Sequence, residues 1–334
     1  MKITFEFILT KKCSLVCNYC FEKGSPLSKM EDTPVSKDNI FDFVKNILSM
    51  YIPNEVDIIF SGGEPLIKFD LIKEIIDFFY KTYPTIKTKP LLLTNGVLLD
   101  YNKIDYLNKN DVRVKLSIDG GEGINDSNRK FKNSEESVYH NLLNKIDSIR
   151  QLGVVMVVLP KTSPSLYRSF SNLYFLGAKR FYLNFEVVFS EWSPEDYFVL
   201  KEQLRKISNF YLKKKTNLFI NHLEKRPGTN KNPCQGSFSQ NIRFVLMPNG
   251  EVLPCLAGIM PSSSEIYNSL KYGKVGDLKN AALQDIINRK KEILEFAGQF
   301  ESYICYKKGA YENLIKINNL LGEEYGYVKS GKNI

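Results

Sequence analysis

The sequence predicts an α/β fold in which a parallel sheet forms a partial, six-unit (β/α) barrel. Over the first two thirds of the chain, short apolar strands alternate with helical stretches, and the alternation fades after a helix near 194–212. Alternating strands and helices imply right-handed βαβ units and a parallel sheet. Six such units are too few for a closed eight-fold barrel, so we expect an open, TIM-like partial barrel.

The predicted elements follow one another in a regular order. Strands are expected at 2–10, 55–60, 90–93, 112–118, 154–160 and 180–186. Helices are expected at 36–50, 70–83, 103–109, 134–152 and 194–212, with one more helical segment before the last strand. Residues 243–255 predict a β-hairpin around an Asn-Gly turn. We therefore expect a barrel domain at 1–215 and a small C-terminal α+β module with a helical tail at 216–334.

Composition and charge place the protein in a broad class. The chain has 334 residues, of which 43% are hydrophobic and 25% charged, which is typical of a globular protein. Its longest apolar run is far shorter than the roughly 20 residues of a membrane span, and no signal peptide is evident, so we expect a cytoplasmic protein. The net charge of +9 favours an anionic partner. The basic residues are scattered without interleaved aromatics, which disfavours nucleic acid.

Cys13, Cys17 and Cys20 lie together in residues 13–20, CSLVCNYC, directly after the first predicted strand. A disulfide fits poorly, because three thiols leave one unpaired and a reducing compartment is expected. Structural zinc needs a fourth nitrogen or sulfur ligand, which only a distant cysteine or one of the two histidines could provide. A [4Fe–4S] cluster accepts thiolates at such short spacings and would keep one iron open. This spacing favours the cluster.

Glycine and polar motifs follow three further predicted strands. They are SGGEP at 61–65, TNG at 94–96 and SIDGG at 117–121. In a βα barrel the loops that follow the strands share the C-terminal face, where active sites lie. We therefore expect these motifs to converge on the cysteine loop although they are far apart in the sequence.

Together these motifs resemble the radical S-adenosylmethionine (radical SAM) enzymes. The CxxxCxxC loop with Tyr19 before its last cysteine, the GGEP motif at 62–65, the TNG motif and the stretch 117–129 occur in the family's order. The resemblance covers roughly residues 2–200. It implies that the three cysteines hold three irons of a [4Fe–4S] cluster, and that the methionyl amine and carboxylate of SAM chelate the fourth.

The resemblance also implies a set of cofactor contacts. Tyr19 and Phe21 would lie beside the adenine, and Glu64 would accept a hydrogen bond from the α-ammonium of SAM. Arg129 would pair with the SAM carboxylate, which an arginine fork suits. The remaining implied contacts are Gly62, Gly63, Pro65, Asn95, Ser117 and Asp119.

Alternatives stay open at three of these positions. Arg129 could be an exposed surface arginine, and Ser117 and Asp119 could form only a turn at a strand end. Peptide-modifying members commonly carry a His-Asp pair where this chain has Asn125 and Asp126. That departure weakens any claim of close identity with a particular member.

The remaining cysteines, Cys234, Cys255 and Cys305, resemble part of the auxiliary-cluster module known as SPASM, or of its shortened form, twitch. Both modules carry more cysteines than the three available here. A second iron–sulfur cluster would then have an open iron, able to bind a substrate thiolate, or a non-cysteine ligand. The alternatives are a buried structural cysteine without a second cluster, and a thiol that donates a hydrogen atom to a substrate radical.

The resemblance implies an oxidoreductase that cleaves SAM reductively and abstracts a hydrogen through a 5′-deoxyadenosyl radical. Members with an auxiliary module mostly modify peptides, so we expect maturation of a ribosomally made peptide (a RiPP) by a thioether, carbon–carbon or similar cross-link. An acidic leader suits the net charge of +9, and a flavodoxin or ferredoxin would supply electrons. Because the barrel begins at residue 2, the leader would bind the barrel, the C-terminal module or a separate protein.

Three other functions remain open. One is oxidation of a protein side chain, as in sulfatase maturases, and another is dehydrogenation of a small molecule. The third, from a different class, is a non-catalytic iron–sulfur carrier or scaffold. Glu64 and the motif at 117–129 argue against a scaffold, because a scaffold needs no SAM pocket.

Overall fold

The structure, a computed structural model, describes residues 2–20, 28, 31–33, 35–50, 52–214, 217–224, 241–254, 268–299 and 308–330. Its main feature is a ten-stranded sheet in the order β12-β11-β10-β1-β3-β4-β5-β7-β8-β9. Every pairing from β10 to β9 is parallel, whereas β11 and β12 are antiparallel to their neighbours. The predicted α/β fold with a mainly parallel sheet is confirmed.

The six predicted barrel strands, which correspond to β1, β3, β4, β5, β7 and β8, begin and end within three residues of their predicted bounds, whereas the short β9 was not predicted. The bounds are β1 (Lys2–Ile8), β3 (Glu55–Ser61), β4 (Lys87–Thr94), β5 (Arg113–Ser117), β7 (Leu152–Val158), β8 (Arg180–Phe185), β9 (Phe219–Ile220), β10 (Asn241–Leu246), β11 (Glu251–Leu253) and β12 (Gly273–Lys274). A separate two-stranded ribbon pairs β2 (Leu15–Cys17) with β6 (Arg129–Phe131).

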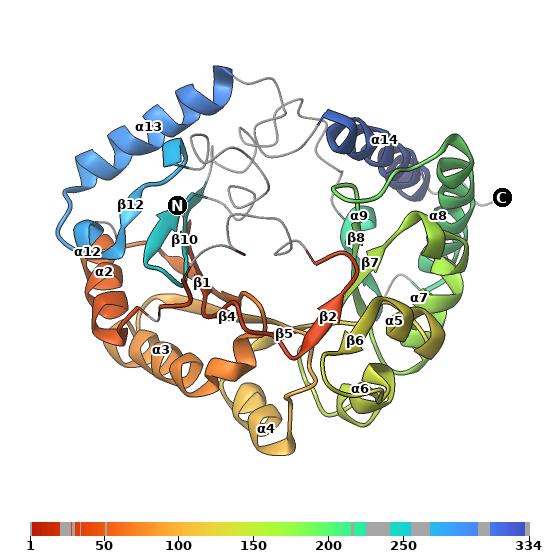
Figure 1. Ribbon diagram of the computed structural model, residues 1–334, viewed down its shortest axis with the longest axis horizontal. Helices are drawn as coiled ribbons and strands as arrows, with labels where there is room; N and C mark the ends of the chain where they lie inside the picture. Colours follow the sequence, from red (N-terminus) through yellow and green to blue (C-terminus); the bar gives the residue numbers. More distant parts are fainter. Residues whose placement is uncertain are drawn as a thin grey trace.

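The helices lie in a ring outside the strands, as Figure 1 shows. Their bounds are α2 (Lys37–Met50), α3 (Phe69–Thr82), α4 (Tyr101–Lys109), α5 (Glu122–Asn128), α6 (Val138–Ile146), α7 (Leu166–Phe175), α8 (Pro194–Lys214), α9 (Asn221–Glu224), α12 (Val275–Leu278), α13 (Leu283–Gln299) and α14 (Lys308–Ser330). Two 3₁₀ turns, η1 (Pro65–Lys68) and η2 (Pro160–Ser165), follow β3 and β7.

Alternation along each strand separates a helix-facing side from a lumen-facing side. In β1, Ile3, Phe5 and Phe7 are buried with apolar residues of α2 and α3. The intervening side chains of Lys2 and Glu6 form ion pairs with residues of the neighbouring strands β3 and β10. Because side chains on a strand alternate between faces, one face of the sheet packs under the helices and the other carries polar groups into the barrel.

The predicted long helix at 134–152 is wrong at both ends, since α6 covers only Val138–Ile146. Ser137 caps its first turn by accepting a hydrogen bond from the backbone N–H of His140 at 3.0 Å. Beyond its end, the side chain of Asn108 binds the carbonyl of Ser148 at 2.8 Å and the N–H of Arg150 at 2.9 Å. These tertiary hydrogen bonds hold 148–150 as the loop that leads into β7.

The C-terminal hairpin joins the barrel sheet. β10 and β11 pair antiparallel around a turn in which Gly250 has φ +81°, as the Asn-Gly signal predicts. β10 also pairs in parallel with β1, with Phe244 opposite Phe5. The sheet therefore continues past the predicted boundary near residue 215, and the division into two domains stays a prediction.

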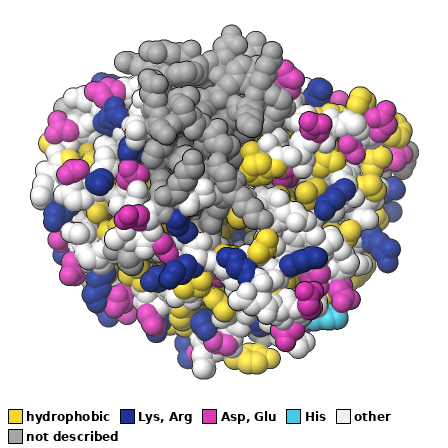
Figure 2. All heavy atoms as spheres, in the orientation of Figure 1, with side chains coloured by type: hydrophobic (Ala, Val, Ile, Leu, Met, Phe, Trp, Pro, Cys, Tyr) yellow, Lys and Arg dark blue, Asp and Glu magenta, His cyan; other side chains and the backbone are white. Residues whose placement is uncertain are grey.

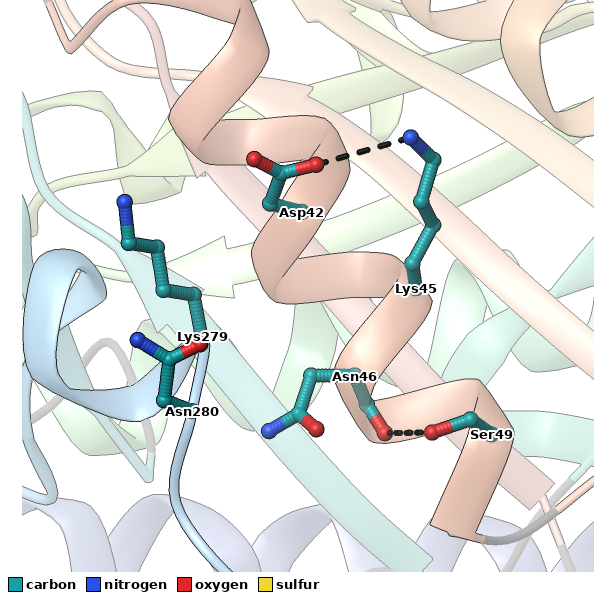
Figure 3. A pocket seen from close by; sticks show the side chains of 6 residues that line it. All are labelled: Asp42, Lys45, Asn46, Ser49, Lys279 and Asn280. Carbon is teal, nitrogen blue, oxygen red and sulfur yellow. Dashed lines mark hydrogen bonds and ion pairs between the residues drawn. The ribbon is translucent and has the colours of Figure 1, made fainter.

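The segment after β12 packs against the outer face of α2. Asn46 donates hydrogen bonds to the carbonyls of Leu278 and Ala281, at 2.9 and 3.0 Å. A hollow of about 470 Å³ lies at this junction. Figure 3 shows Lys279 and Asn280 of the C-terminal segment across from Asp42 and Asn46 of α2. The hollow lies between a barrel helix and the C-terminal segment, on the helix side of the sheet and away from the strand ends.

The C-terminal helix α14 packs on α8. Glu324, which is 2% exposed, pairs with Arg205 at 2.9 Å, and Tyr327 donates a hydrogen bond to Asn209 at 2.8 Å. Ile317 and Leu321 are buried in the same apolar cluster as the helices over β5, β7 and β8. Within the part of the chain that the structure describes, no helix is long and apolar enough to cross a membrane.

Candidate functional site

The cysteine loop is held in place by the ribbon of β2 and β6. Their antiparallel pairing sets Cys17 directly opposite Arg129. The ribbon continues at both ends, where the N–H of Asn18 donates to the carbonyl of Asn128 and the N–H of Lys132 to that of Ser14, each at 3.0 Å. The loop after β1 and the segment that follows SIDGG, far apart in the sequence, thus form one unit at the ends of the strands.

The three thiols lie in this loop without a disulfide between them. The Sγ atom of Cys13 accepts hydrogen bonds from the N–H of Leu15 and from the side-chain amide of Asn95, each at 3.4 Å. This contact brings the TNG motif to the cysteine loop. Burial raises the pKa of the Cys17 thiol to about 11, and the nearby Arg129 opposes that shift.

The GGEP glycines pack against the backbone that leads into the cysteine loop. Gly62 has φ +122°, and a Cβ atom there would lie 2.6 Å from the carbonyl oxygen of Thr10. A Cβ on Gly63 would lie 2.4 Å from the carbonyl oxygen of Lys12. The two segments are also hydrogen-bonded: the N–H of Gly63 donates to the carbonyl of Thr10 and the N–H of Glu64 donates to the carbonyl of Lys12, both at 2.8 Å. The absence of side chains lets the two loops approach closely.

Glu64 is fully buried and ties two strand ends together. Its carboxylate accepts hydrogen bonds from the hydroxyl of Thr94 at 2.6 Å and from the N–H groups of Asn95 at 2.8 Å and Leu66 at 3.1 Å. Burial raises the pKa of Glu64 above its ordinary value, and these three donors counteract the shift. Pro65 follows as the first residue of η1. The predicted contact of Glu64 with the ammonium of SAM stays a prediction.

Asp119 and Arg129 form a buried ion pair at the centre of the site. The Arg129 guanidinium donates to both carboxylate oxygens, at 3.2 and 3.1 Å, and both side chains are almost completely buried. Burial alone would lower the pKa of Arg129. The negative charge of Asp119 outweighs this effect, so the pKa is raised and the guanidinium stays charged. The alternative of an exposed surface arginine is wrong, because Arg129 is 5% exposed.

Tyr19 joins this ion pair from the cysteine loop. Its hydroxyl donates a hydrogen bond to Asp119, and its ring lies 5.2 Å from the guanidinium carbon of Arg129. Burial raises the pKa of Tyr19 well above its ordinary range, so the hydroxyl keeps its proton. The N–H of Val157, in β7, donates to the other oxygen of Asp119 at 2.9 Å. Asp119 therefore links the cysteine loop, β6 and β7 and does more than form a turn.

Asn125 and Asp126 support the end of β5. The side-chain oxygen of Asn125 accepts from the N–H of Asp119 at 3.2 Å. Its amide donates to Asp126, which also accepts from the N–H of Tyr139 at 2.9 Å. Ser117 is the last residue of β5 and is half-buried, opposite Val155 of β7. These contacts fix the position of Asp119 within the site.

The donor set of this loop fits an iron–sulfur cluster. Each iron of a [4Fe–4S] cluster takes one thiolate, so three cysteines in one loop serve three irons. No group of three His, Cys, Asp or Glu side chains among the described residues is arranged to hold a single metal ion. The adjacent glycine backbone and buried Arg129 fit an amino-acid carboxylate beside the cluster.

Four predicted residues lie outside the described part of the chain. They are Phe21, predicted beside the adenine, and the second cysteine set, Cys234, Cys255 and Cys305. The hairpin that precedes Cys255 is described and ends at β11. The auxiliary cluster thus stays a prediction.

Glu186 is a candidate site residue that the sequence motifs do not indicate. It follows β8 and, because side chains alternate along a strand, lies on the same face as Tyr182 and Asn184. Its N–H donates to the carbonyl of Val158 at 2.9 Å. One carboxylate oxygen accepts from the N–H groups of Val188 and Phe189, at 2.6 and 2.8 Å. The other is buried without a hydrogen-bond partner among the described residues. The available signal was an acidic residue at the end of a predicted strand.

Charge on the visible face of the molecule is mixed. Figure 2 shows Lys and Arg side chains interspersed with Asp and Glu over the described surface. This agrees with the scattered basic residues of the sequence, whose net charge is +9. On this face the excess positive charge is not gathered into one continuous patch.

Comparison with known sequences finds a family profile that matches the part of the chain that carries this site. The sequence profile of the radical SAM superfamily matches residues 7–167. An uncharacterized protein of Methanocaldococcus jannaschii is 28% identical over 75% of this chain and 86% of its own length. A cysteine-type anaerobic sulfatase-maturating enzyme of Clostridium perfringens is 31% identical, over 35% of this chain and 33% of its own. The radical SAM cyclopropyl synthase TigE of Paramaledivibacter caminithermalis is 27% identical over 40% of this chain and 31% of its own.

Solved structures share the fold over the whole chain. The structure of anSMEcpe with bound AdoMet and the Kp18Cys peptide has a TM-score of 0.77 at 16% identity and covers 100% of both chains. Streptococcus suis SuiB bound to S-adenosylmethionine has a TM-score of 0.57 at 14% identity and covers 94% of this chain and 67% of its own. Together with the profile match, the fold and the cysteine loop at the strand ends lead to one identification: residues 7–167 of this chain form a radical SAM domain.

Proposed function

We propose that this chain is a radical SAM enzyme that modifies a peptide, forming a thioether, carbon–carbon or similar cross-link in a ribosomally made precursor. The observation that carries the proposal is the pairing of β2 with β6, which sets Cys17 opposite the buried Arg129. Arg129 has five N–H donors and gives two of them to Asp119, so its guanidinium beside the three-cysteine loop could also bind an anionic cofactor group, which a bare scaffold would not need. When bound, the cluster and SAM supply one-electron reduction and hydrogen-atom abstraction.

The chain's own residues would bind and orient these groups. Cys13, Cys17 and Cys20 would supply the thiolates, and Asp119 holds the Arg129 fork in one orientation. We propose that Arg129 receives the SAM carboxylate and Glu64 its ammonium. The further proposed contacts are Tyr19, Phe21, Gly62, Gly63, Pro65, Asn95, Ser117 and Asp119.

Anaerobic reconstitution with iron, sulfide, SAM and a strong reductant tests the proposal. We expect 5′-deoxyadenosine to form, with flavodoxin or ferredoxin as the proposed biological donor. Cys17→Ala should abolish the product. Val16→Ala is a matched control in the same loop, because the Val16 side chain is 38% exposed. A reconstituted, iron-loaded protein that forms no 5′-deoxyadenosine contradicts the enzyme assignment.

The peptide substrate rests on a more indirect argument. The anSMEcpe structure named above holds the Kp18Cys peptide, and a further structure of SuiB is bound to the precursor peptide SuiA. The net charge of +9 suits an acidic leader. Co-expression with short peptides encoded beside the gene, followed by mass spectrometry, tests this. A loss of hydrogen from a peptide that depends on Cys17 supports a cross-link, and unmodified peptides alongside active SAM cleavage contradict it.

We include Glu186 in the proposed substrate site. Its unpartnered carboxylate oxygen is buried after β8, at the same end of the sheet as Asp119. A buried acceptor without a partner is unfavourable unless a bound group supplies a donor. Glu186→Gln should lower the amount of modified peptide formed per 5′-deoxyadenosine, whereas the exposed Glu191→Gln should not. An unchanged ratio in Glu186→Gln would remove this residue from the site.

We also propose a second cluster on Cys234, Cys255 and Cys305. The β10–β11 hairpin that leads to Cys255 has the expected antiparallel form. Chemical analysis should find roughly eight irons per chain, falling to about four in a Cys234→Ala, Cys255→Ala double variant. About four irons in both proteins would refute the auxiliary cluster.

Oxidation of a protein side chain is the second candidate function. It is favoured by the sulfatase-maturating relative at 31% identity and by the full-length likeness to anSMEcpe. Incubation with a peptide that carries one cysteine, followed by mass spectrometry, separates the two functions. Conversion of the single cysteine to an aldehyde supports side-chain oxidation, whereas an intramolecular bond supports a cross-linking enzyme.

A further inference from the structure

A second pocket lies at the opposite end of the barrel from the cysteine loop. Its volume is about 290 Å³, and the strands β5, β7 and β8 line it near their N-terminal ends, together with Leu91 from the middle of β4. Arg113 and Asp119 both belong to the β5 segment and are six residues apart, or about 20 Å at roughly 3.3 Å per residue. The pocket is therefore distinct from the candidate SAM site.

Four basic side chains line this pocket, and none of its lining residues is acidic. They come from three places in the fold: Arg113 and Lys115 from β5, Arg150 from the loop before β7, and Arg180 from β8. Tyr182 and Gly153 complete the wall, and a Cβ on Gly153 would lie 2.9 Å from the Tyr182 ring. The topology thus gathers positive charge from separate strands around one hollow.

The nearby carboxylates neutralise this charge only in part, because they pair with two of the four basic groups. Asp57 lies 3.5 Å from Arg113 but also pairs with Lys2 at 2.5 Å. Asp111 pairs with Arg150 at 2.6 Å, at the rim of the pocket. Among the described residues, Lys115 and Arg180 pair with aromatic rings and not with carboxylates: the Lys115 ammonium lies 3.7 Å from the centre of Tyr182, and the Arg180 guanidinium 4.7 Å from that of Phe219.

Lys115 is strongly perturbed by its surroundings. Burial, followed by the positive charges of Arg113 on its own strand, Arg180 on β8 and Arg243 on β10, lowers its pKa to about 8. Asp57 on β3 acts in the opposite direction. An anion in the pocket would relieve this repulsion, because an opposite charge nearby favours the protonated amine.

We propose that this pocket binds a small phosphate-bearing molecule, of the size of a di- or triphosphate group. Three guanidinium groups and one ammonium converge on a hollow too small for a folded partner, and guanidinium forks match phosphate oxygens. A polyphosphate carries several anionic oxygens within this volume, whereas the carboxylates of an acidic peptide are spread along a chain. The site is independent of the radical SAM function proposed above.

Isothermal titration calorimetry with inorganic triphosphate, on the full-length protein at pH 7, tests the proposal. Saturable one-to-one binding is expected, and Arg180→Gln should weaken it about tenfold, as expected for one charged hydrogen bond. Arg180 is exposed, so this variant should fold normally. Arg168→Gln, an exposed arginine on α7, makes the same charge change away from the pocket and should bind as the parent does. No saturable binding, or equal weakening by both variants, overturns the site.

Two further measurements make the test specific. Titrations near pH 8 in buffers of different ionisation enthalpy should detect proton uptake on binding, and Lys115→Gln should abolish this uptake. Proton uptake that persists in Lys115→Gln contradicts the assigned geometry.

An oligoglutamate peptide should bind more weakly than triphosphate. If it binds more tightly, and Arg180→Gln weakens it, the pocket receives an acidic peptide and the phosphate proposal is wrong.

Discussion

Asp119 determines the geometry of the candidate site at the scale of single residues. Its carboxylate accepts from Arg129, Tyr19 and the N–H of Val157. Asp119→Asn would leave the buried Arg129 without a counter-charge, so we expect the free energy of unfolding to fall by about 3–5 kcal/mol. Urea denaturation of the purified protein measures this loss.

An exposed carboxylate provides the control for this substitution. Asp105 on α4 pairs with Lys109 at 2.7 Å, and its side chain is 59% exposed. Asp105→Asn should change the free energy of unfolding by less than about 1 kcal/mol, because exposed pairs contribute little. Equal losses in the two variants would mean that burial does not govern the Asp119–Arg129 pair.

Glu64 gives the protein a pH-dependent stability. Its folded-state pKa is raised above 4.5, mainly by burial. A carboxyl group whose pKa is higher in the folded state stabilises the fold fully at a pH below its pKa in the unfolded state. This stabilisation is lost as the pH rises through the pKa of the folded state. The stability advantage of the parent over Glu64→Gln should therefore shrink as pH rises from the ordinary glutamate range. Unfolding free energies measured across pH 4 to 7 test this, and an advantage that grows with pH would reverse the sign.

The cysteines were predictable residue by residue, whereas their surroundings were not. Cys13, Cys17 and Cys20 share one loop, so their spacing alone indicates that they bind the same metal centre. The contact of Tyr19 with Asp119 joins residues that are 100 positions apart. This contact depends on how the side chains of two distant loops are oriented in the fold, which the pattern of predicted strands does not reveal. Glu186 went unpredicted for the same reason, because its unpaired oxygen is a property of the packed site.

At the scale of elements, the ribbon of β2 and β6 positions the cysteine loop. Lys130 lies opposite Val16 in this pairing, away from the thiols themselves. Lys130→Pro removes a backbone donor from the ribbon, so we expect the reconstituted protein to hold about half of the iron or less. Lys130→Thr keeps the donor and should hold iron as the parent does. Iron analysis after anaerobic reconstitution decides, and equal iron content in both variants would show that the ribbon is dispensable.

Short elements were the hardest to predict. β2 and β6 have three residues each, too few for a hydrophobic period, and their pairing is non-local. The α6 error has a related cause. Its helical pattern seemed to extend to Leu152, but Asn108 holds 148–150 in a loop through tertiary hydrogen bonds. The main strands were predictable because each is a longer apolar run bounded by turn residues.

At the scale of the whole molecule, Phe244 joins the C-terminal hairpin to the barrel core. It lies 5.6 Å from both Phe5 and Phe43 and 5.4 Å from Tyr272, measured between ring centres. Phe244→Ala should lower the free energy of unfolding by about 3–5 kcal/mol. Because the sheet is continuous, one cooperative transition should shift as a unit in thermal unfolding. Phe198→Ala, at a position 67% exposed, is the control. Two separate transitions, with only one shifted, would contradict this coupling.

The parallel pairing of β1 with β10 has a consequence for synthesis of the chain. β1 is made first, yet its partner strand at Asn241–Leu246 is made after most of the chain. While the ribosome is still translating, one edge of β1 lacks its neighbour, and the loop that follows β1 carries the three cysteines. Long-range pairings of this kind form late in folding. We therefore expect the edge of β1 that precedes the cysteine loop to stay unpaired until the hairpin has been translated.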